Sequence, residues 1–275
     1  EDLRIDHSIL EQNAESYRKI RNTFRFILGN LKDDFSPKDF KKIKYEDFPE
    51  LEKLILHKLF ILDSEIKNNL KNYNFHKLQK DLLNFCALDL SSFYFDIRKD
   101  ILYCDDLSSK KRKFCVDLLN IILECLIKWY APVLSFTTEE ITELAQKGKK
   151  ASIHEESFPE IPQNWKNESL FQKWEKLLVV RQEVNIAIEE KRSKKIIGSS
   201  LEADVEITLP KVEFDLLQKI DAQELFITSN VLQSISKEKS ISVTVKKAKG
   251  TKCSRCWKIV KEVKNNKCLR CSKIK

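Results

Sequence analysis

Apolar residues recur at helical spacing over long stretches of this chain, with little glycine or proline to interrupt them. The 275 residues include only four glycines and six prolines. A stretch with apolar residues at every third or fourth position forms a helix that buries one stripe. The lengths of these stretches suit a helical bundle. We therefore predict a mainly α fold, with helices over residues 9–30, 51–70, 75–90, 110–130 and 170–192 and a short one from residue 137.

The first of these helices has two different faces. Tyr17, Ile20 and Phe24 fall on its apolar side. Its other side carries four residues with strong donor groups: Arg18, Arg21, Asn22 and Arg25. Arginine on a rigid helix presents a fork of N–H groups that matches a phosphate or a base edge. This pattern predicts either a nucleic-acid contact or a solvated helix face, and leaves both open.

A dense apolar run over residues 91–105 contains Arg98. The run is too apolar for a surface helix, so we expect a buried connection between helices of the bundle. Arg98 would then be internal, or it would face an RNA.

The second half of the chain changes its period. Charged residues, glycine and proline interrupt the helical pattern over residues 146–162, which predicts a domain boundary. The helix beyond it has Arg181 in its apolar line, as a paired buried charge or as an RNA contact. Polar and apolar residues alternate over residues 203–209, as in a half-buried strand.

A short helix is predicted after Pro210, and further strands over residues 224–228 and 241–246. We expect a small α/β junction subdomain with antiparallel strands and one helix. The predicted domains are a helical bundle over residues 1–150, a long helix with the junction subdomain over residues 151–250, and a metal-binding module over residues 251–275.

Two Cys-x-x-Cys pairs, Cys253 with Cys256 and Cys268 with Cys271, are separated by eleven residues. Four thiolates complete a tetrahedron around one Zn²⁺ ion without an open position, so the zinc would be structural. Redox dithiols or spare cysteines are the alternatives. So short a segment has little apolar core, and metal binding would supply its folding free energy. The other cysteines lie singly in apolar surroundings and are predicted core thiols: Cys86, Cys104, Cys115 and Cys125.

Positive charge is concentrated at the C-terminal end. The whole chain has a net charge of +8, whereas residues 237–275 alone carry 14 Lys and Arg against two Glu, a net +12. Such a field attracts polyanions, although a solubilising tail is the alternative. Trp257, with Arg255 and Lys258 beside it, could stack on an unpaired base while the cations hold the backbone. The indole could equally cover the zinc thiolates.

The sequence has no signal for export or membrane insertion. It contains no run of eighteen apolar residues, and its first residues lack a signal-peptide pattern. We expect a cytoplasmic, monomeric protein. The absence of methionine, at position 1 included, predicts a piece of a longer chain.

Several motifs in this chain resemble the class I aminoacyl-tRNA synthetases, and specifically the bacterial isoleucyl-tRNA synthetases. The first is Tyr-Arg-Lys-Ile-Arg-Asn-Thr at residues 17–23, and the last is Lys-Cys-Ser-Arg-Cys-Trp at residues 252–257. Between them, residues 94–103 follow the family's Tyr-x-Asp-x-x-Lys-Asp-x-Leu-Tyr signature. Residues 131–141 resemble the family's Ala-Pro to Glu-Glu-Ile ending, with Ser135 in place of the usual second proline.

The resemblance implies the C-terminal, tRNA-binding part of such an enzyme, which recognises the anticodon stem-loop of isoleucine tRNA. The implied tRNA contacts are Arg18, Arg21, Asn22, Arg25, Arg98, Arg181, Arg255, Trp257 and Lys258. The parent enzymes join isoleucine to tRNA with ATP and Mg²⁺, but their ATP-binding and editing domains have no counterpart here. We therefore expect no catalytic residues and no activity from this chain alone. The alternatives are a free-standing zinc-knuckle protein that binds RNA or DNA, and a helical scaffold for protein partners.

Overall fold

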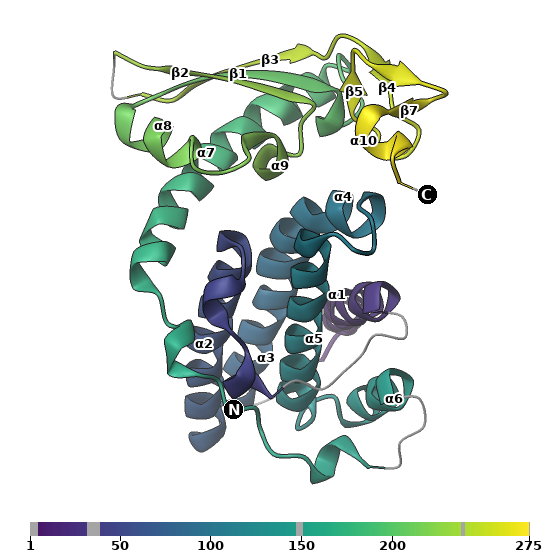
Figure 1. The fold of residues 1–275 in the computed structure, drawn as a ribbon. Helices are drawn as coiled ribbons and strands as arrows, with labels where there is room; N and C mark the ends of the chain where they lie inside the picture. The colour runs from purple at the N-terminus through teal and green to yellow at the C-terminus, as the bar shows by residue number, and fades with distance from the viewer. Residues whose placement is uncertain (1–4, 32–38, 147–150, 238–239, 275) are drawn as a thin grey trace. The chain divides into compact units, whose positions relative to one another are not determined.

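The computed structural model describes residues 5–31, 39–146, 151–237 and 240–274. Helices dominate this part of the chain, as predicted, and small sheets follow in its C-terminal part (Figure 1). Two compact units are present: Glu1–Arg98 with Ser108–Asn167, here the helical unit, and Lys99–Leu107 with Glu168–Lys275, here the mixed unit. The three-domain division stays a prediction, because compactness does not show which parts fold alone. Residues 147–150 of the predicted boundary lie outside the described residues.

The helical unit is a bundle whose helices are α1 His7–Leu31, α2 Glu50–Lys71, α3 Phe75–Asn84, α5 Lys110–Tyr130 and α6 Ser135–Gln146. Each long helix buries one apolar stripe, as Ile20 and Phe24 do on α1 and Leu54 does on α2. Helix α1 packs against α5, and α2 packs against α3 and α5. None of the helices in the described ranges is long and apolar enough to cross a membrane. Short 3₁₀ turns join these helices at Phe40–Lys42, Tyr45–Asp47, Ile153–Glu155 and Gln163–Trp165.

Helix α1 begins earlier than its sequence suggests. Ser8 and Glu11 have the spacing of a capping box, which predicts a start near Ile9. The helix instead starts at His7, and the Asp6 carboxylate accepts hydrogen bonds from the His7 backbone N–H at 2.7 Å and the Ser8 hydroxyl at 2.8 Å. The Asp6 backbone carbonyl accepts the Ile9 and Leu10 N–H groups at 3.1 and 3.3 Å, so the first turn forms ahead of the predicted start.

The apolar run that follows α3 is helical, and not only a connection. A π-helical segment, Phe85–Phe95, continues α3 and leads directly into α4, Asp96–Cys104. The Ser91 hydroxyl donates to the Cys86 carbonyl at 2.8 Å, five residues back, the same offset as the backbone hydrogen bonds of a π-helix. The expected burial is confirmed for part of residues 91–105, including Phe93, Tyr94 and Phe95, whereas Tyr103 is 56% exposed.

The mixed unit contains a three-stranded sheet of β1 Ala203–Leu209, β2 Asn230–Ile235 and β3 Ser242–Lys247, in the order β2-β1-β3. The side chains of β1 are buried at every second position, which leaves one face covered and one open. The covered face packs against α7 Glu168–Ser193, α8 Lys211–Leu217 and α9 Ala222–Phe226 (Figure 1).

Two features of this sheet differ from the prediction. The expected strand over residues 224–228 is α9, which Asp221 caps by accepting the Glu224 backbone N–H at 3.0 Å. The strand β2 was not predicted, and it pairs parallel to β1 while β3 pairs antiparallel. A parallel partner needs a crossover, which α8 and α9 supply, and no local sequence pattern reports that pairing.

The C-terminal end of the mixed unit, residues 251–272, is here called the knuckle. It consists of two hairpins, β4 Thr251–Lys252 with β5 Ile259–Val260 and β6 Val263–Lys264 with β7 Lys267–Cys268, followed by α10 Leu269–Ser272.

Gly250 sets the path of the chain into the knuckle, and its replacement by alanine should destabilise the mixed unit. Its φ is +141°, and an added Cβ would lie 2.5 Å from the Val260 carbonyl oxygen. Strain of this kind costs about 1–3 kcal/mol. Gly29→Ala is the matched control, since a Cβ there meets nothing within 4 Å and should add up to about 1 kcal/mol of helix stability. Urea denaturation of both variants measures the difference, and equal free energies of unfolding would contradict it.

Candidate nucleic-acid interface and metal centre

The two predicted faces of α1 are present. Ile20, Phe24 and Ile27 are buried, whereas Arg18, Asn22 and Arg25 are exposed and Arg21 is half-buried. The bundle packing therefore turns the four predicted contact residues outward. Whether these side chains contact RNA stays a prediction.

Arg21 is held in one orientation by α6. Its Nη1 donates to Glu140 Oε2 at 2.7 Å and its Nη2 to Glu140 Oε1 at 3.1 Å. The Tyr17 hydroxyl accepts a further bond from Arg21 at 3.2 Å and lies 2.8 Å from the Thr137 hydroxyl. The hydrogen bonds to Glu140 raise the pKa of Arg21, and those from Arg21 lower the pKa of Glu140. The network joins α1 to α6 and fixes the guanidinium at the surface.

The other predicted residues of α1 have fewer constraints. Arg18 forms an ion pair with Glu15, one turn earlier on the same helix. Arg25 is exposed and makes no ion pair with any residue in the described part of the chain. Among the described residues, no carboxylate competes with an outside anion for Arg25, unlike Arg18 and Arg21.

Both carboxylates of the Glu-Glu-Ile motif have structural roles that the sequence alone did not assign. Glu140 orients Arg21, as described above. Glu139 accepts the Ser152 hydroxyl at 2.9 Å and the Ile153 backbone N–H at 3.0 Å. It therefore anchors the turn at Ile153–Glu155 against α6. The motif itself was the signal that these two residues matter.

The predicted RNA contact by Arg98 is wrong. Its side chain is 3% exposed, and its Nε and Nη2 donate to the two carboxylate oxygens of Glu52, itself 0% exposed, at 2.6 and 2.7 Å. The Tyr94 hydroxyl donates to the same carboxylate at 3.1 Å, and the Cys115 thiol lies 3.6 Å from it. A guanidinium enclosed in this way cannot reach a ligand, so the internal alternative holds. The expectation of buried thiols is also confirmed for Cys86, Cys104, Cys115 and Cys125.

Arg181 lies on α7 with its side chain partly buried. Its Nε donates to the Leu225 carbonyl at 3.0 Å, near the C-terminal end of α9. A cation is favourable there because carbonyl groups at a helix end lack partners within the helix. This contact gives Arg181 a structural role in the mixed unit, and a contact with RNA stays a prediction.

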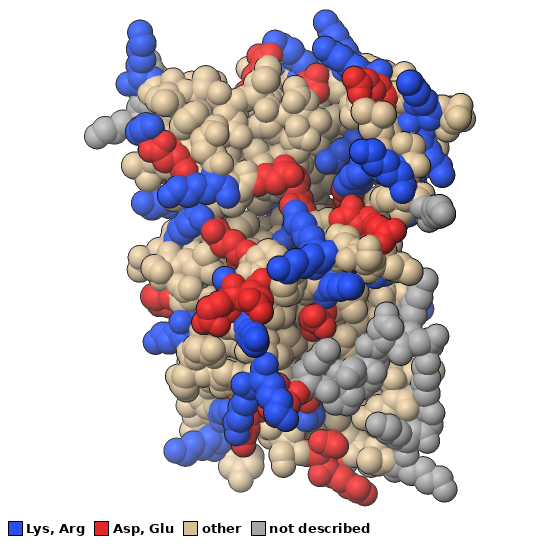
Figure 2. Space-filling view, viewed as in Figure 1, with Lys and Arg blue, Asp and Glu red and all other residues tan. Residues whose placement is uncertain are grey.

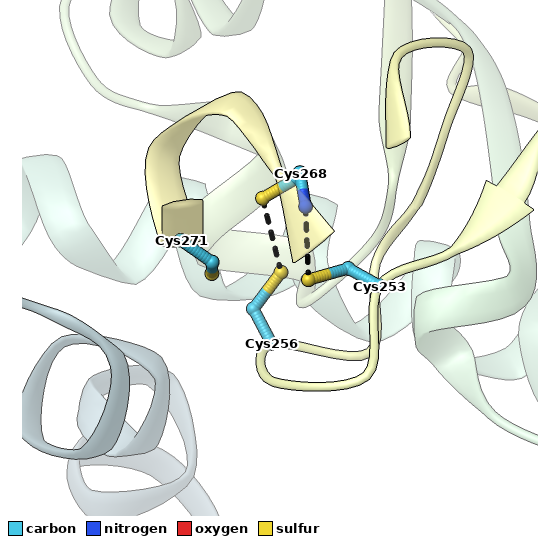
Figure 3. A group of neighbouring side chains, drawn as sticks. All are labelled: Cys253, Cys256, Cys268 and Cys271. Atoms are coloured by element: carbon cyan, nitrogen blue, oxygen red, sulfur yellow. Dashed lines mark hydrogen bonds between the residues drawn. The ribbon is translucent and has the colours of Figure 1, made fainter. Parts of the chain in front are cut away.

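The four cysteines of the two Cys-x-x-Cys pairs converge on one point (Figure 3). All four are buried, and their sulfur atoms lie within 4.8 Å of one another. Four sulfurs at about 2.3 Å from a tetrahedral zinc ion would be about 3.8 Å apart. The Sγ atoms of Cys256 and Cys268 are 3.8 Å apart, so the cluster could hold a metal ion.

Backbone donors prepare this cluster for anionic sulfur. The Cys268 backbone N–H donates to the Cys253 sulfur at 3.3 Å (Figure 3). Burial raises the pKa of Cys253, but backbone N–H groups of Cys256, Cys268 and Arg255 outweigh it and lower that pKa to about 6. Burial raises the pKa of Cys256. A cation bound at this cluster would favour the thiolate forms of its sulfur atoms.

The predicted ligand-binding residues of the knuckle lie around this cluster. Trp257 is 60% exposed, and the Lys252 ammonium lies 5.9 Å from the centroid of its ring. Arg255 is partly buried and donates to the Ile274 carbonyl at 3.5 Å, and Lys258 is also partly buried. Lysine and arginine side chains gather over this end of the mixed unit in Figure 2. By their exposure, the cations of this end that face solvent include Lys249, Lys252, Lys261, Lys264 and Lys267.

Residues 52–207 match the model of one protein family, the anticodon-binding domain of tRNA ligase. The match covers more than half of the chain, from the third residue of α2 to the fifth residue of β1. The chain therefore belongs to this family.

The chain is also similar to curated isoleucine–tRNA ligases. It is 53% identical over 259 residues to the isoleucine–tRNA ligase of Pelagibacter ubique. The alignment covers 94% of this chain and 28% of that relative. The corresponding enzymes of Agrobacterium fabrum and Mesorhizobium japonicum are 41% and 39% identical, each over 94% of this chain and 27% of the relative. The chain thus spans little more than a quarter of the length of the relatives it matches.

Proposed function

We propose that this chain is the tRNA-binding region of an isoleucine–tRNA ligase and that it binds the anticodon stem-loop of isoleucine tRNA. The observation that carries the proposal is the 53% identity to an isoleucine–tRNA ligase over 94% of the chain, joined to the match with the anticodon-binding family. The parent protein would join isoleucine to tRNA with ATP and Mg²⁺ in domains outside these residues. Such a role implies a cytoplasmic protein, and we infer that it acts as a monomer.

On α1, the exposed arginines would bind the RNA. Arg25 would pair with a phosphate or a base edge, and Arg21 would present the part of its guanidinium that Glu140 leaves open. Arg18 and Asn22 extend the same face. The bases reached would be those of the single-stranded loop, because the deep major groove of an A-form stem excludes side chains.

The knuckle would supply the second set of contacts and would be organised by one Zn²⁺ ion on Cys253, Cys256, Cys268 and Cys271. The tetrathiol donor set and the sulfur spacing support zinc over harder cations. With no open coordination position the ion would be structural. Trp257 would stack on an unpaired base, and its exposed indole favours this role over a cover for the sulfurs. Arg255 and Lys258 would hold the adjacent phosphates.

The two rival functions have less support. A free-standing zinc-knuckle protein or a protein-interaction scaffold would not require the family match over residues 52–207, nor similarity to isoleucine–tRNA ligases along nearly the whole chain.

Fluorescence anisotropy with a labelled anticodon stem-loop tests the α1 contacts. Arg25→Ala should weaken binding by roughly 1–3 kcal/mol and blur discrimination if it reads a base. If Arg25 binds a phosphate, affinity should fall equally for all stem-loops. The slope of log affinity against log salt concentration should then decrease by about one. Arg21→Ala should act in the same direction.

Lys80→Ala is the matched control, since it removes an exposed positive charge from α3. It should leave binding within a few tenths of a kcal/mol. Unchanged affinity in both arginine variants would overturn the assignment of this face, and equal affinity for stem-loops of other tRNAs would overturn the isoleucine assignment.

A further inference from the structure

The mixed unit includes a short segment from much earlier in the chain, Lys99–Leu107, at the C-terminal end of α4. This segment contacts the turn of the second Cys-x-x-Cys pair. Arg270, between Cys268 and Cys271, donates through Nη1 and Nη2 to the two carboxylate oxygens of Asp100, at 2.6 Å each. Its Nη1 also lies 3.8 Å from Asp105 Oδ1.

The same segment contacts the turn of the first pair. Cys104 is 5% exposed and packs into one cluster with the four cysteines of the metal centre. Its thiol donates to the carbonyl of Arg255, between Cys253 and Cys256, at 3.6 Å. Each Cys-x-x-Cys turn is therefore contacted at its middle by Lys99–Leu107, the first by Cys104 and the second by Asp100 with a longer contact from Asp105.

We propose that Asp100 and Cys104 are positioning residues of the metal centre, and that Lys99–Leu107 is a clasp that keeps its two turns at metal-binding distance. The inference rests on the proposed metal centre and adds residues about 150 positions before the first cysteine pair. The knuckle has little apolar interior of its own, so its turns need an outside support. A fifth cysteine and a two-oxygen carboxylate clamp provide that support.

Charge and geometry predict opposite effects of Asp100→Asn on the rate of metal loss, so one measurement distinguishes them. By Coulomb's law alone, removing a negative charge beside four thiolates should stabilise them and slow metal loss. A positioning role requires the opposite, because Arg270 loses its charged clamp and the second turn loosens. Outer-shell substitutions of this kind lower metal affinity by about 10–100-fold.

The experiment measures the transfer of zinc from the metal-loaded chain to a chromophoric chelator. Asp100→Asn should release zinc at least about 10-fold faster than the unchanged chain. Arg270→Lys, which keeps the charge and loses the two-pronged contact, should also release it faster. Asp215→Asn is the matched control for the first variant, because it breaks an ion pair of 2.8 Å with Lys211 on α8. Lys267→Arg is the control for the second, and neither control should change the rate.

Hydrogen exchange followed by mass spectrometry gives a second readout. Removing the metal from the unchanged chain should speed exchange in residues 99–107 and leave residues 203–209 of β1 protected. The clasp would be contradicted if Asp100→Asn released zinc more slowly or at an unchanged rate, or if metal removal left hydrogen exchange in residues 99–107 unchanged. Neither result would contradict the metal centre itself. A chain that binds no zinc at all would overturn both.

Discussion

Replacing Arg98 with alanine should lower the free energy of unfolding of the helical unit by about 3–5 kcal/mol. The substitution leaves the Glu52 carboxylate buried without its cation, and Tyr94 alone cannot compensate for the lost charge. Desolvation of an unpaired carboxylate is the dominant cost, because water cannot reach it. Urea denaturation followed by far-ultraviolet circular dichroism measures the loss.

Two controls separate this effect from the loss of an arginine in general. Arg25→Ala removes an exposed arginine from the same unit and should change stability by no more than about 0.5 kcal/mol. The double variant Glu52→Leu with Arg98→Met replaces the ion pair by apolar groups and should recover most of the lost stability. If Arg98→Ala were as mild as Arg25→Ala, the buried ion pair would not be the support that its geometry indicates.

Removing the metal should unfold the knuckle and leave the helical unit intact. Structural zinc sites in small peptides contribute about 10–16 kcal/mol at neutral pH, and without that energy a segment with so few buried apolar groups does not fold. The knuckle also joins the sheet through the Ile259 backbone N–H, which donates to the Ser229 hydroxyl at 2.7 Å. Loosening should therefore extend to the start of β2.

Treatment with a chelator, or the substitution Cys256→Ala, should give this result in hydrogen exchange over residues 251–272. The matched control is Cys86→Ala, which removes a buried thiol outside the metal centre and should leave the zinc content at one ion per chain. A thermal melt in which the transition of the helical unit fell together with metal loss would contradict the separation of the two parts.

Local sequence patterns predicted the elements that depend only on residues a few positions apart. The apolar stripe of α1 has the helical period, so its buried and exposed faces followed from residues a few positions apart. The four cysteines of the metal centre were predicted for the same reason, since each Cys-x-x-Cys turn places its own two sulfurs together. The alternating residues of β1 gave its bounds without reference to the rest of the sheet.

The errors in the sheet arose from a pairing between distant segments and from competing local signals. The strand β2 has no strong alternation of its own, and its place in the sheet comes from pairing in parallel with β1. In residues 224–228 the apolar content suggested a strand. A helix forms instead, because Asp221 caps its start and Ile227, with a left-handed φ of 56°, ends it. Such competition between local signals is decided by what packs against the segment.

The sequence by itself determined where the helices lie, which cysteines can share an ion and which side chains carry the positive charge. Only the tertiary structure decided which of those charges remain available to a ligand. Three arginines bind carboxylates that are distant in the chain: Arg98 at 46 residues, Arg21 at 119 and Arg270 at 170. Arg98 is enclosed with its carboxylate and cannot reach a ligand, whereas Arg21 keeps part of its guanidinium at the surface, and that difference depends on how distant segments pack together.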